Sequence, residues 1–480
     1  MSDGDVQRAT RGLPCAIPCR LEGSAAEPAP SSANQPPLPP ATLDELITLA
    51  ADFDAVSAGE EDRDDTGSLL TAAPANVPAN AAEAITLDAH RRAIVADAFD
   101  RIAGLARQRV RRPWKHKPSR EQRILEQLDA IAATRTPLAV SEWGAERAAD
   151  GSAMWALFFV LGCTDSHEAF DEIVAWTERV DAAACSGAAE ALAVSPCSRV
   201  GDLAAMLLRS PAPTGQAVGI ELSTRRELIS RDDLVRWLAA PASEARATAV
   251  RCLGLGAALG AHVTAQVAAM LEHEPRVAVE AARALALWGD WRGLDWVRRT
   301  GFEQSDVADA ALELFVLSGA EHDLDTLDPI LRRRVTTTGH LDLVARFGHP
   351  GCWSFLIHHL DDDRLAEAAA DALCVLFGAL VGEEQRWSRR AWEEAVAIGP
   401  FEDNIRYRGG IPWSPVAVVL EVERGDLTSF AVDQRTAELR ARCAPNTPPA
   451  PWLGAWHPTA ERQLQDFLSQ YRTRHPSSWG

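Results

Sequence analysis

Evenly spaced glycines constrain the fold of this 480-residue chain more than any other feature. Five of them follow one another at intervals of 29 or 30 residues: Gly260, Gly289, Gly319, Gly348 and Gly378. Each of the last four comes directly after an apolar run of helical composition. A period of this length is typical of a protein in which each repeat is one pair of short helices.

Two apolar stripes at helical spacing lie between Gly260 and Gly289. Their residues are Val263, Val267, Met270 and Leu271 in the first, and Val279, Ala282, Leu285 and Ala286 in the second. We expect a helix for each stripe and a left-handed glycine at the end of each second helix. Because two such short helices can barely bury their stripes, we expect successive pairs to stack into an α-solenoid. The alternative is an ordinary helical bundle whose glycines happen to be evenly spaced.

Composition divides the chain into four regions. Residues 1–40 are rich in Pro, Ser and Ala, and we expect a disordered tail. Residues 41–148 predict N-terminal helices with acidic and basic linkers, including helices that end before Pro113 and at about Thr134. Residues 149–382 are the predicted repeat array. Residues 383–480 are Trp-rich and interrupted by prolines, and we expect a helical cap that covers the end of the array.

Two segments, from Glu244 to Gly254 and from Arg276 to Gly289, resemble bacterial HEAT-like repeats. The stretch from Arg364 to Gly378 and the tail from Arg424 to Leu439 are similar to an uncharacterised proteobacterial HEAT-repeat family. The resemblance covers roughly half of the chain, and its motifs are specific for fold but not for function. It implies an all-α, armadillo-like helical fold. Because some members of that family are encoded near type VI secretion components, it also implies an accessory or adaptor role.

Charge, cysteine spacing and hydropathy indicate the environment in which the chain is expected to work. The net charge of −20 argues against a general binder of nucleic acid or of anionic membranes. No apolar run approaches the roughly 20 residues of a membrane-spanning helix, and the first twenty residues lack a secretory signal. The nine cysteines are not evenly spaced, which favours free thiols in a reducing compartment. We therefore expect a cytoplasmic protein without a membrane span.

Candidate metal ligands are few. The dipeptides His167-Glu168 and His273-Glu274 are of the kind that HEAT-repeat iron hydroxylases use, but those enzymes use four dipeptides at matching repeat positions. Here only two are present, and they lie at different positions relative to the glycines of their repeats. The densest cluster of ligand-type residues consists of His349, His358, His359 and Asp361 to Asp363, which a solvated helix end and cap explain better. We predict no metal, no cofactor and no catalytic residue, with a metal-dependent hydroxylase or lyase as the alternative function.

The strongest local charge lies in residues 107–123. This segment holds eight basic residues and one Glu, so its charge is +7 and the remaining chain carries −27. Trp114 stands within it, as an aromatic side chain would in a nucleic-acid-binding patch. Three interpretations stay open: pairing with acidic residues of the same chain such as 60–65, docking to an acidic protein, or binding of nucleic acid.

Tryptophan is unusually frequent, with 15 residues. Three of them cluster at one turn between repeats, and six fall in the last hundred residues: Trp387, Trp392, Trp413, Trp452, Trp456 and Trp479. These residues are either anchors for a partner or the packing of the cap onto the last repeat.

Taken together, these patterns predict a non-catalytic scaffold or adaptor that presents a curved solenoid surface to another protein. Nucleic acid is the less favoured partner. The candidate partner-binding residues are Arg107, Arg109, Arg111, Arg112, Trp114, Lys115, Lys117, Trp288, Trp291, Trp296, Trp413, Trp452 and Trp456.

Overall fold

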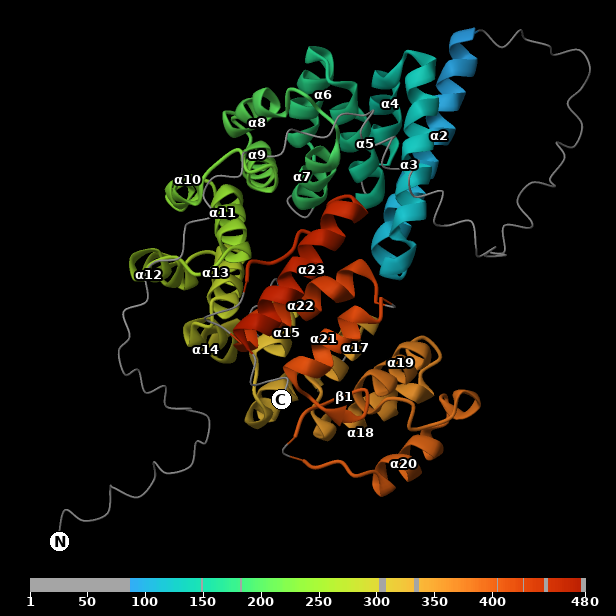
Figure 1. Ribbon diagram of the computed structural model, residues 1–480, viewed down its shortest axis with the longest axis vertical. Coiled ribbons are helices and arrows are strands. Elements are labelled where there is room, and N and C mark those ends of the chain that lie inside the picture. Colours follow the sequence, from blue (N-terminus) through green and yellow to red (C-terminus); the bar gives the residue numbers. More distant parts are fainter. Residues whose placement is uncertain are drawn as a thin grey trace, which may run out of the picture. The chain divides into compact units, whose positions relative to one another are not determined.

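The computed structural model shows a chain built from helices (Figure 1). It describes residues 87–147, 150–181, 184–301, 308–331, 336–403, 405–425, 427–443 and 448–475. Helices make up nearly all of the regular structure in these residues, so the predicted all-α class is confirmed. The predicted disordered tail 1–40 and the acidic run 60–65 lie outside the described residues.

The first described helices are the two predicted around Pro113. Helix α2 (Leu87–Arg111) ends just before this proline, and a turn of 3-10 helix, η1 (Trp114–His116), leads into α3 (Lys117–Thr134). A proline removes a backbone donor and disfavours helical geometry in the residue before it, so the chain turns here. The two helices pack side by side through the apolar faces that the pattern predicts, and α4 (Val140–Glu146) follows them.

From residue 151 onward two kinds of helix alternate along the chain. Helices of the first kind, which we call the row helices, each pack against the next of their kind: α5 (Gly151–Thr164), α7 (Cys185–Val194), α9 (Pro213–Arg225), α11 (Ser243–Leu255), α13 (Pro275–Leu287), α15 (Ala308–Ser318), α17 (Thr338–Phe347) and α19 (Ala366–Phe377). The helices between them are α6 (His167–Thr177), α8 (Val200–Leu208), α10 (Arg231–Trp237), α12 (Ala261–Ala269), α14 (Trp291–Trp296), α16 (Leu324–Leu331) and α18 (Trp353–His358).

Small residues allow the row helices to pack closely. Helix α13 begins with Pro275, which suits the first helical position, and buries alanines along much of its length. In α11, a Cβ atom on Gly254 would lie 3.1 Å from the Cα atom of Ala284 in α13. A larger side chain at either position would push the two helices apart. The abundant Ala and Gly of this part of the sequence are therefore explained by helix–helix contact.

The evenly spaced glycines have more than one structural role. Gly289, Gly348 and Gly378 follow row helices with φ of 73°, 79° and 72°, as expected for glycines that end helices. The prediction is wrong for Gly319, which follows α15 but does not have a positive φ. Gly260, which was not expected to follow a helix directly, has φ −53° and precedes α12 as its N-cap. The shared spacing therefore does not mean a shared conformation.

The C-terminal region is not a simple cap. It contains α20 (Arg389–Ile398), β1 (Tyr407–Arg408), β2 (Ile411–Pro412), α21 (Pro415–Glu423), α22 (Ser429–Cys443) and α23 (His457–Arg474). The short antiparallel hairpin β1–β2 was not expected from the sequence. Its backbone lies against two row-helix ends: the amide of Tyr407 donates to the carbonyl of Gly348 at 2.6 Å, and that of Gly409 to Val375 at 2.8 Å.

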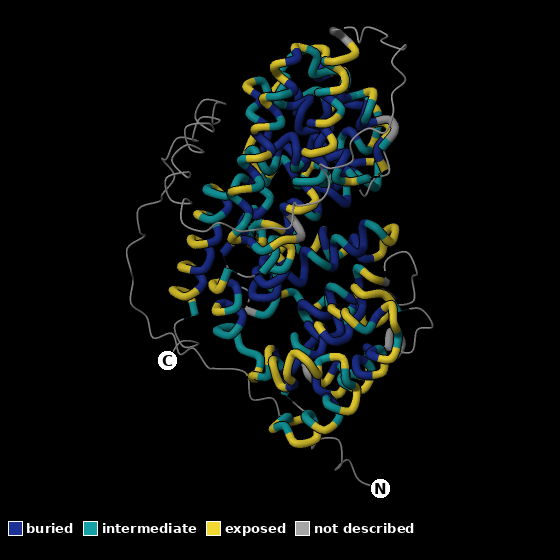
Figure 2. The backbone as a smooth tube through the Cα atoms, turned by 90° about the vertical axis from the view of Figure 1, so that its right-hand side faces the viewer, coloured by how far each residue is buried: buried dark blue, intermediate teal, exposed yellow. Residues whose placement is uncertain are grey.

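Helices α22 and α23 connect distant parts of the chain (Figure 1). Helix α22 packs against α2, α13 and α15, and α23 packs against α3. Buried residues run through the interior of the helical part of the chain (Figure 2). Their apolar members form three clusters: one from α2 to α9, one from α9 to β1, and a third that joins α21–α23 to Trp114. The C-terminal region therefore braces the helices of both the first and the second cluster, instead of covering only the last pair.

None of the helices in the described residues is both long and apolar enough to pass through a lipid bilayer.

The contact between Gly348 and the hairpin makes a testable prediction. A Cβ atom on Gly348 would lie 2.5 Å from the carbonyl oxygen of Tyr407, and φ is positive, so Gly348→Ala should lower the free energy of unfolding by at least about 1–3 kcal/mol. Gly104→Ala is the control, because this glycine lies within α2 with open space around its Cβ position. It should stabilise the protein by about 0.5–1 kcal/mol. Urea denaturation measures both changes. A Gly348→Ala variant as stable as wild type would contradict the close approach of Gly348 to Tyr407.

Candidate interaction site

The basic segment and the C-terminal region meet in a buried polar cluster. We call it the polar seam, and it consists of Arg109, Lys117, Glu121, Glu190 and the backbone carbonyls of residues 453–455. Arg109, in the last turn of α2, is only 4% exposed. It donates to Glu121 (Nε–Oε1 3.0 Å) and to Glu190 (Nη1–Oε1 3.0 Å). Its Nη2 donates to the backbone oxygens of Gly454 and Ala455.

Lys117 completes the polar seam from the first turn of α3. The residue is 1% exposed, and its Nζ donates to the carbonyls of Leu453 at 2.7 Å and Ala455 at 2.6 Å. Burial, and next the charge of Arg109, lower the pKa of Lys117 to about 7, although Glu121 and Glu190 act in the opposite direction. A buried lysine that donates to two backbone carbonyls in this way positions the backbone and is not exposed to a partner.

Tryptophans surround the polar seam. The guanidinium of Arg109 lies over the rings of Trp155 and Trp456, 5.7 and 5.8 Å from their centroids. The Nζ atom of Lys117 lies 4.6 Å from the centroid of Trp114. The indole of Trp114 donates to Glu461 at 2.8 Å, and that of Trp456 donates to the carbonyl of Val194 at 2.9 Å. These rings shield the charges from water, which strengthens the ion pairs.

The other basic residues of segment 107–123 lie differently. Arg107 is exposed and pairs with Asp150. Arg112 and Lys115 are exposed, and the side chain of Arg111 lies outside the described part of the chain. The segment therefore contributes its two most buried cations to contacts within the chain. Of the three interpretations of this segment, pairing within the same chain describes Arg109 and Lys117, with Glu121 and Glu190 as partners.

Helix α22 uses arginines to bind the ends of row helices. Arg440 donates to the carbonyls of Gly254 and Gly256 at the end of α11, at 2.9 and 2.8 Å. Arg442 donates to the carbonyl of Val316 in the last turn of α15, at 2.9 Å. Carbonyls in the last turn of a helix lack partners within that helix and carry partial negative charge. The arginines of α22 satisfy them.

Glu438, also in α22, is the buried counter-charge of this region. It accepts hydrogen bonds from Arg408 at 3.1 Å and from the indole of Trp413 at 2.9 Å. Burial alone would raise the pKa of Glu438, but Arg408, Arg442 and then Arg435 outweigh it and bring the pKa down to about 2. The carboxylate therefore stays ionised in the folded protein.

The row helices present paired charges on the side that faces α22. Glu221 of α9 pairs with Arg225 of the same helix and with Arg251 of α11. Arg283 of α13 pairs with Glu313 of α15 at 2.8 Å, and Glu313 also accepts a hydrogen bond from Gln434 of α22. This side of the row is thus occupied by the chain's own C-terminal helix.

The three tryptophans predicted to cluster at one turn have different environments. Trp288 and Trp296 are buried, and the indole of Trp288 donates to the carbonyl of Gly256. Trp291, the first residue of α14, is 71% exposed.

Three of the C-terminal tryptophans pack in two places. Trp392 packs next to Phe377 at the last row helix, as expected for a cap. Trp452 and Trp456 instead pack against the apolar cluster of the first helices. The expectation that they cover the last repeat is therefore wrong for these two. Trp479 lies outside the described residues.

The histidine candidates do not converge. His167 lies beside Arg199, His273 beside Glu274, and His349 caps its own turn by accepting from the amide of Gly351. Within the described ranges, no three His, Cys, Asp or Glu side chains are placed to hold a metal ion.

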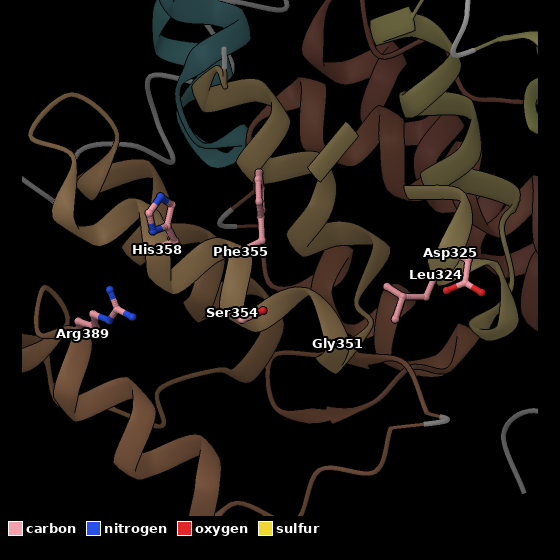
Figure 3. Close-up of a pocket in the computed structure, with 7 residues that line it drawn as sticks. All are labelled: Leu324, Asp325, Gly351, Ser354, Phe355, His358 and Arg389. Atoms are coloured by element: carbon pink, nitrogen blue, oxygen red, sulfur yellow. The ribbon is translucent and has the colours of Figure 1, made fainter. Parts of the chain in front are cut away.

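A shallow pocket beside α18 contains His358 (Figure 3). Its other lining residues are Leu324, Asp325, Gly351, Ser354, Phe355 and Arg389. Asp325 lies on the opposite side of the pocket from His358, and Ser354 stands between them (Figure 3). Arg389 is held by Asp361 and Glu393. The pocket thus brings no acid, base and nucleophile into a common reacting geometry.

Comparison with known proteins returns no match: no protein-family model, no curated protein and no solved structure is similar to the chain at a significant level.

Sequence reasoning missed the acidic half of the polar seam. Glu190 lies in an Ala-rich run of α7, 81 residues from Arg109, and nothing local marks it as a partner. The arginines of α22 carried a weak signal, because an Arg-rich helix after the array needs acceptors. Those acceptors are backbone carbonyls, which every residue has, so the sequence does not show which ones are used.

The polar seam predicts a large difference between two neighbouring arginines. Arg109→Met leaves the buried Glu121 and the half-buried Glu190 without their main counter-charge and should lower the free energy of unfolding by about 3–5 kcal/mol. Arg107→Met removes an exposed ion pair and should change it by no more than about 1 kcal/mol. Chemical denaturation of both variants tests this difference. Equal effects would show that the polar seam does not hold the two ends of the fold together.

Glu438 predicts a loss of stability in acid. The pKa of Glu438 is lowered from 4.5 to about 2 in the folded protein, so its contribution is complete above pH 4.5 and is lost as the pH falls toward 2. Glu438→Gln cannot titrate and leaves Arg408 and Arg442 without this counter-charge. It should be less stable than wild type at pH 7 and lose less stability on acidification. Urea midpoints at several pH values measure both, and the exposed Glu384→Gln should behave as wild type. If Glu438→Gln lost as much stability on acidification as wild type does, Glu438 would not be the group responsible.

Proposed function

We propose that this chain is a non-catalytic protein-binding scaffold, built as an α-solenoid of HEAT-like helical hairpins. The row helices begin 28 to 34 residues apart, and each packs on the next, which supports a stacked array of helix pairs. Such arrays offer extended surfaces to other proteins. In this chain α22 already covers α13 and α15, so the proposed partner binds to exposed residues elsewhere.

Trp291 is the observation that carries this proposal. Its neighbours Trp288 and Trp296 are buried, whereas Trp291 extends from the first turn of α14 and is 71% exposed. The turn that holds it is well ordered by polar contacts, since Asp290 caps α14 and pairs with Arg292. An exposed Trp on a rigid turn loses little entropy on binding, and Trp is one of the residue types enriched at binding hot spots.

The other candidate functions have less support. Nucleic-acid binding through residues 107–123 would rely on cations of which Arg109 and Lys117 are buried in the polar seam. A metal-dependent hydroxylase would need converging ligands, and the dipeptides at His167 and His273 have separate surroundings.

Partner capture tests the proposal. Tagged full-length protein, exposed to a lysate of its source organism, should retain a defined protein partner after a high-salt wash. Trp291→Ala should reduce the retained amount by at least about tenfold, because hot-spot tryptophans contribute 2 kcal/mol or more. Capture by no variant, wild type included, would contradict the scaffold function.

A matched variant separates an anchor from general apolar stickiness. Leu255→Ala also removes an exposed apolar side chain, but one at the end of a row helix. It should retain the partner at the wild-type level. If Trp291→Ala and Leu255→Ala both bind as wild type does, Trp291 is not the anchor.

A further inference from the structure

Helix α20 ends in an exposed apolar side chain, Ile398, and a second exposed apolar side chain, Trp387, lies in the turn just before the helix. Its inner side is fixed by Trp392, which is fully buried and donates to the carbonyl of Arg386 at 2.8 Å. On the outer side, Trp387 is 47% exposed and Ile398 is 85% exposed. Arg390 and Glu394 lie between them as an exposed ion pair. Positions 390, 394 and 398 share one face of α20 at the spacing i, i+4, i+8, and Trp387 lies in the turn just before the N-cap, Ser388.

Exposed apolar side chains concentrate here. Of the nine large apolar side chains that are exposed in the described residues, four lie between Leu380 and Ile411. Helix α20 follows the last row helix and packs on α18 (Figure 1), so it occupies the position of a terminal cap. Caps of repeat arrays need polar outer faces to stay soluble. An apolar side chain as exposed as Ile398 is therefore costly at this position unless another molecule covers it.

The surroundings of this face are strongly acidic. Residues 361–403 hold eleven Asp and Glu and only four Arg. Three of those arginines are held by neighbouring carboxylates: Arg386 by Asp371 and Glu383, Arg389 by Asp361 and Glu393, and Arg390 by Glu394. The local charge is thus an excess of seven negative charges around two apolar anchors. A second copy of this chain would bring the same acidic surface against it, which charge repulsion disfavours.

We propose that the outer face of α20 binds a basic amphipathic helix of a partner protein. Trp387 lies just before the first turn of α20 and Ile398 is its last residue, so the two fit apolar residues near the two ends of the partner helix. Arginine or lysine residues beside those anchors would meet the acidic residues around α20. This inference rests on the proposed scaffold function and names one binding surface and the class of partner that fits it.

Fluorescence anisotropy with the full-length chain tests the surface. The probe is a labelled synthetic helix of about 18 residues with Leu at i, i+4, i+7 and i+11 and Arg at its flanking positions. An isomer with Glu in place of Arg is the charge control. The wild-type chain should bind the basic helix and not the acidic one, with affinity that falls between about 0.05 and 0.3 M salt.

Two variants distinguish the surface from general attraction between charges. Ile398→Ser should weaken binding of the basic helix at least about tenfold. Leu228→Ser, which alters an exposed leucine far along the sequence, should leave binding unchanged. Both positions are exposed, so both variants should keep the wild-type helical circular dichroism signal.

Four results would overturn the proposal: no binding to wild type, equal binding of the acidic helix, equal binding by Ile398→Ser, or dimers in light scattering that Ile398→Ser abolishes. None of these depends on Trp291, so the scaffold function can stand when this surface fails.

Discussion

The side chain of Arg109 is the contact on which the rest of the fold depends. A guanidinium has five donors in a fixed plane, and here it connects α2 to α3, to α7 and to the C-terminal segment at once. These elements belong to the beginning, the middle and the end of the chain. A buried charge is tolerated only when it is paired and hydrogen-bonded, so the four elements must meet in one arrangement. The polar seam therefore specifies how α2, α3, α7 and the C-terminal segment meet.

The same principle recurs along α22. Arg440 and Arg442 bind the carbonyl ends of α11 and α15, and Glu438 balances the charge of Arg408. Stacked helix pairs leave a row of partially negative helix ends, and arginines on a crossing helix satisfy several of them together. This arrangement has a functional consequence. Helix α22 covers α13 and α15, so the partner surfaces that we propose are formed by the exposed residues Trp291, Trp387 and Ile398.

The candidate site was only partly predictable. The excess of tryptophan drew attention to the turn at residues 288–296, but composition cannot separate the exposed Trp291 from its two buried neighbours. That distinction depends on which side of α14 faces the row, and hence on packing. The basic segment was recognised from its charge, yet Arg107 and Arg109 differ completely in environment, because two positions along a helix point to different sides. Ile398 carried no sequence signal, since an apolar residue at the end of a helix is ordinarily buried.

The sequence by itself determined the helices, because apolar spacing, prolines and small residues act within one or two turns. The helix boundaries around Pro113 and the close contacts of the Ala-rich helices follow from such local rules. Only the tertiary structure decided where the C-terminal region lies and which charges are paired. Those choices depend on contacts such as Arg109–Glu190 and Arg440–Gly254, between residues 81 and 186 positions apart. Their acceptors are a carboxylate in an alanine run and a backbone carbonyl, so no local pattern distinguishes them before the chain has folded.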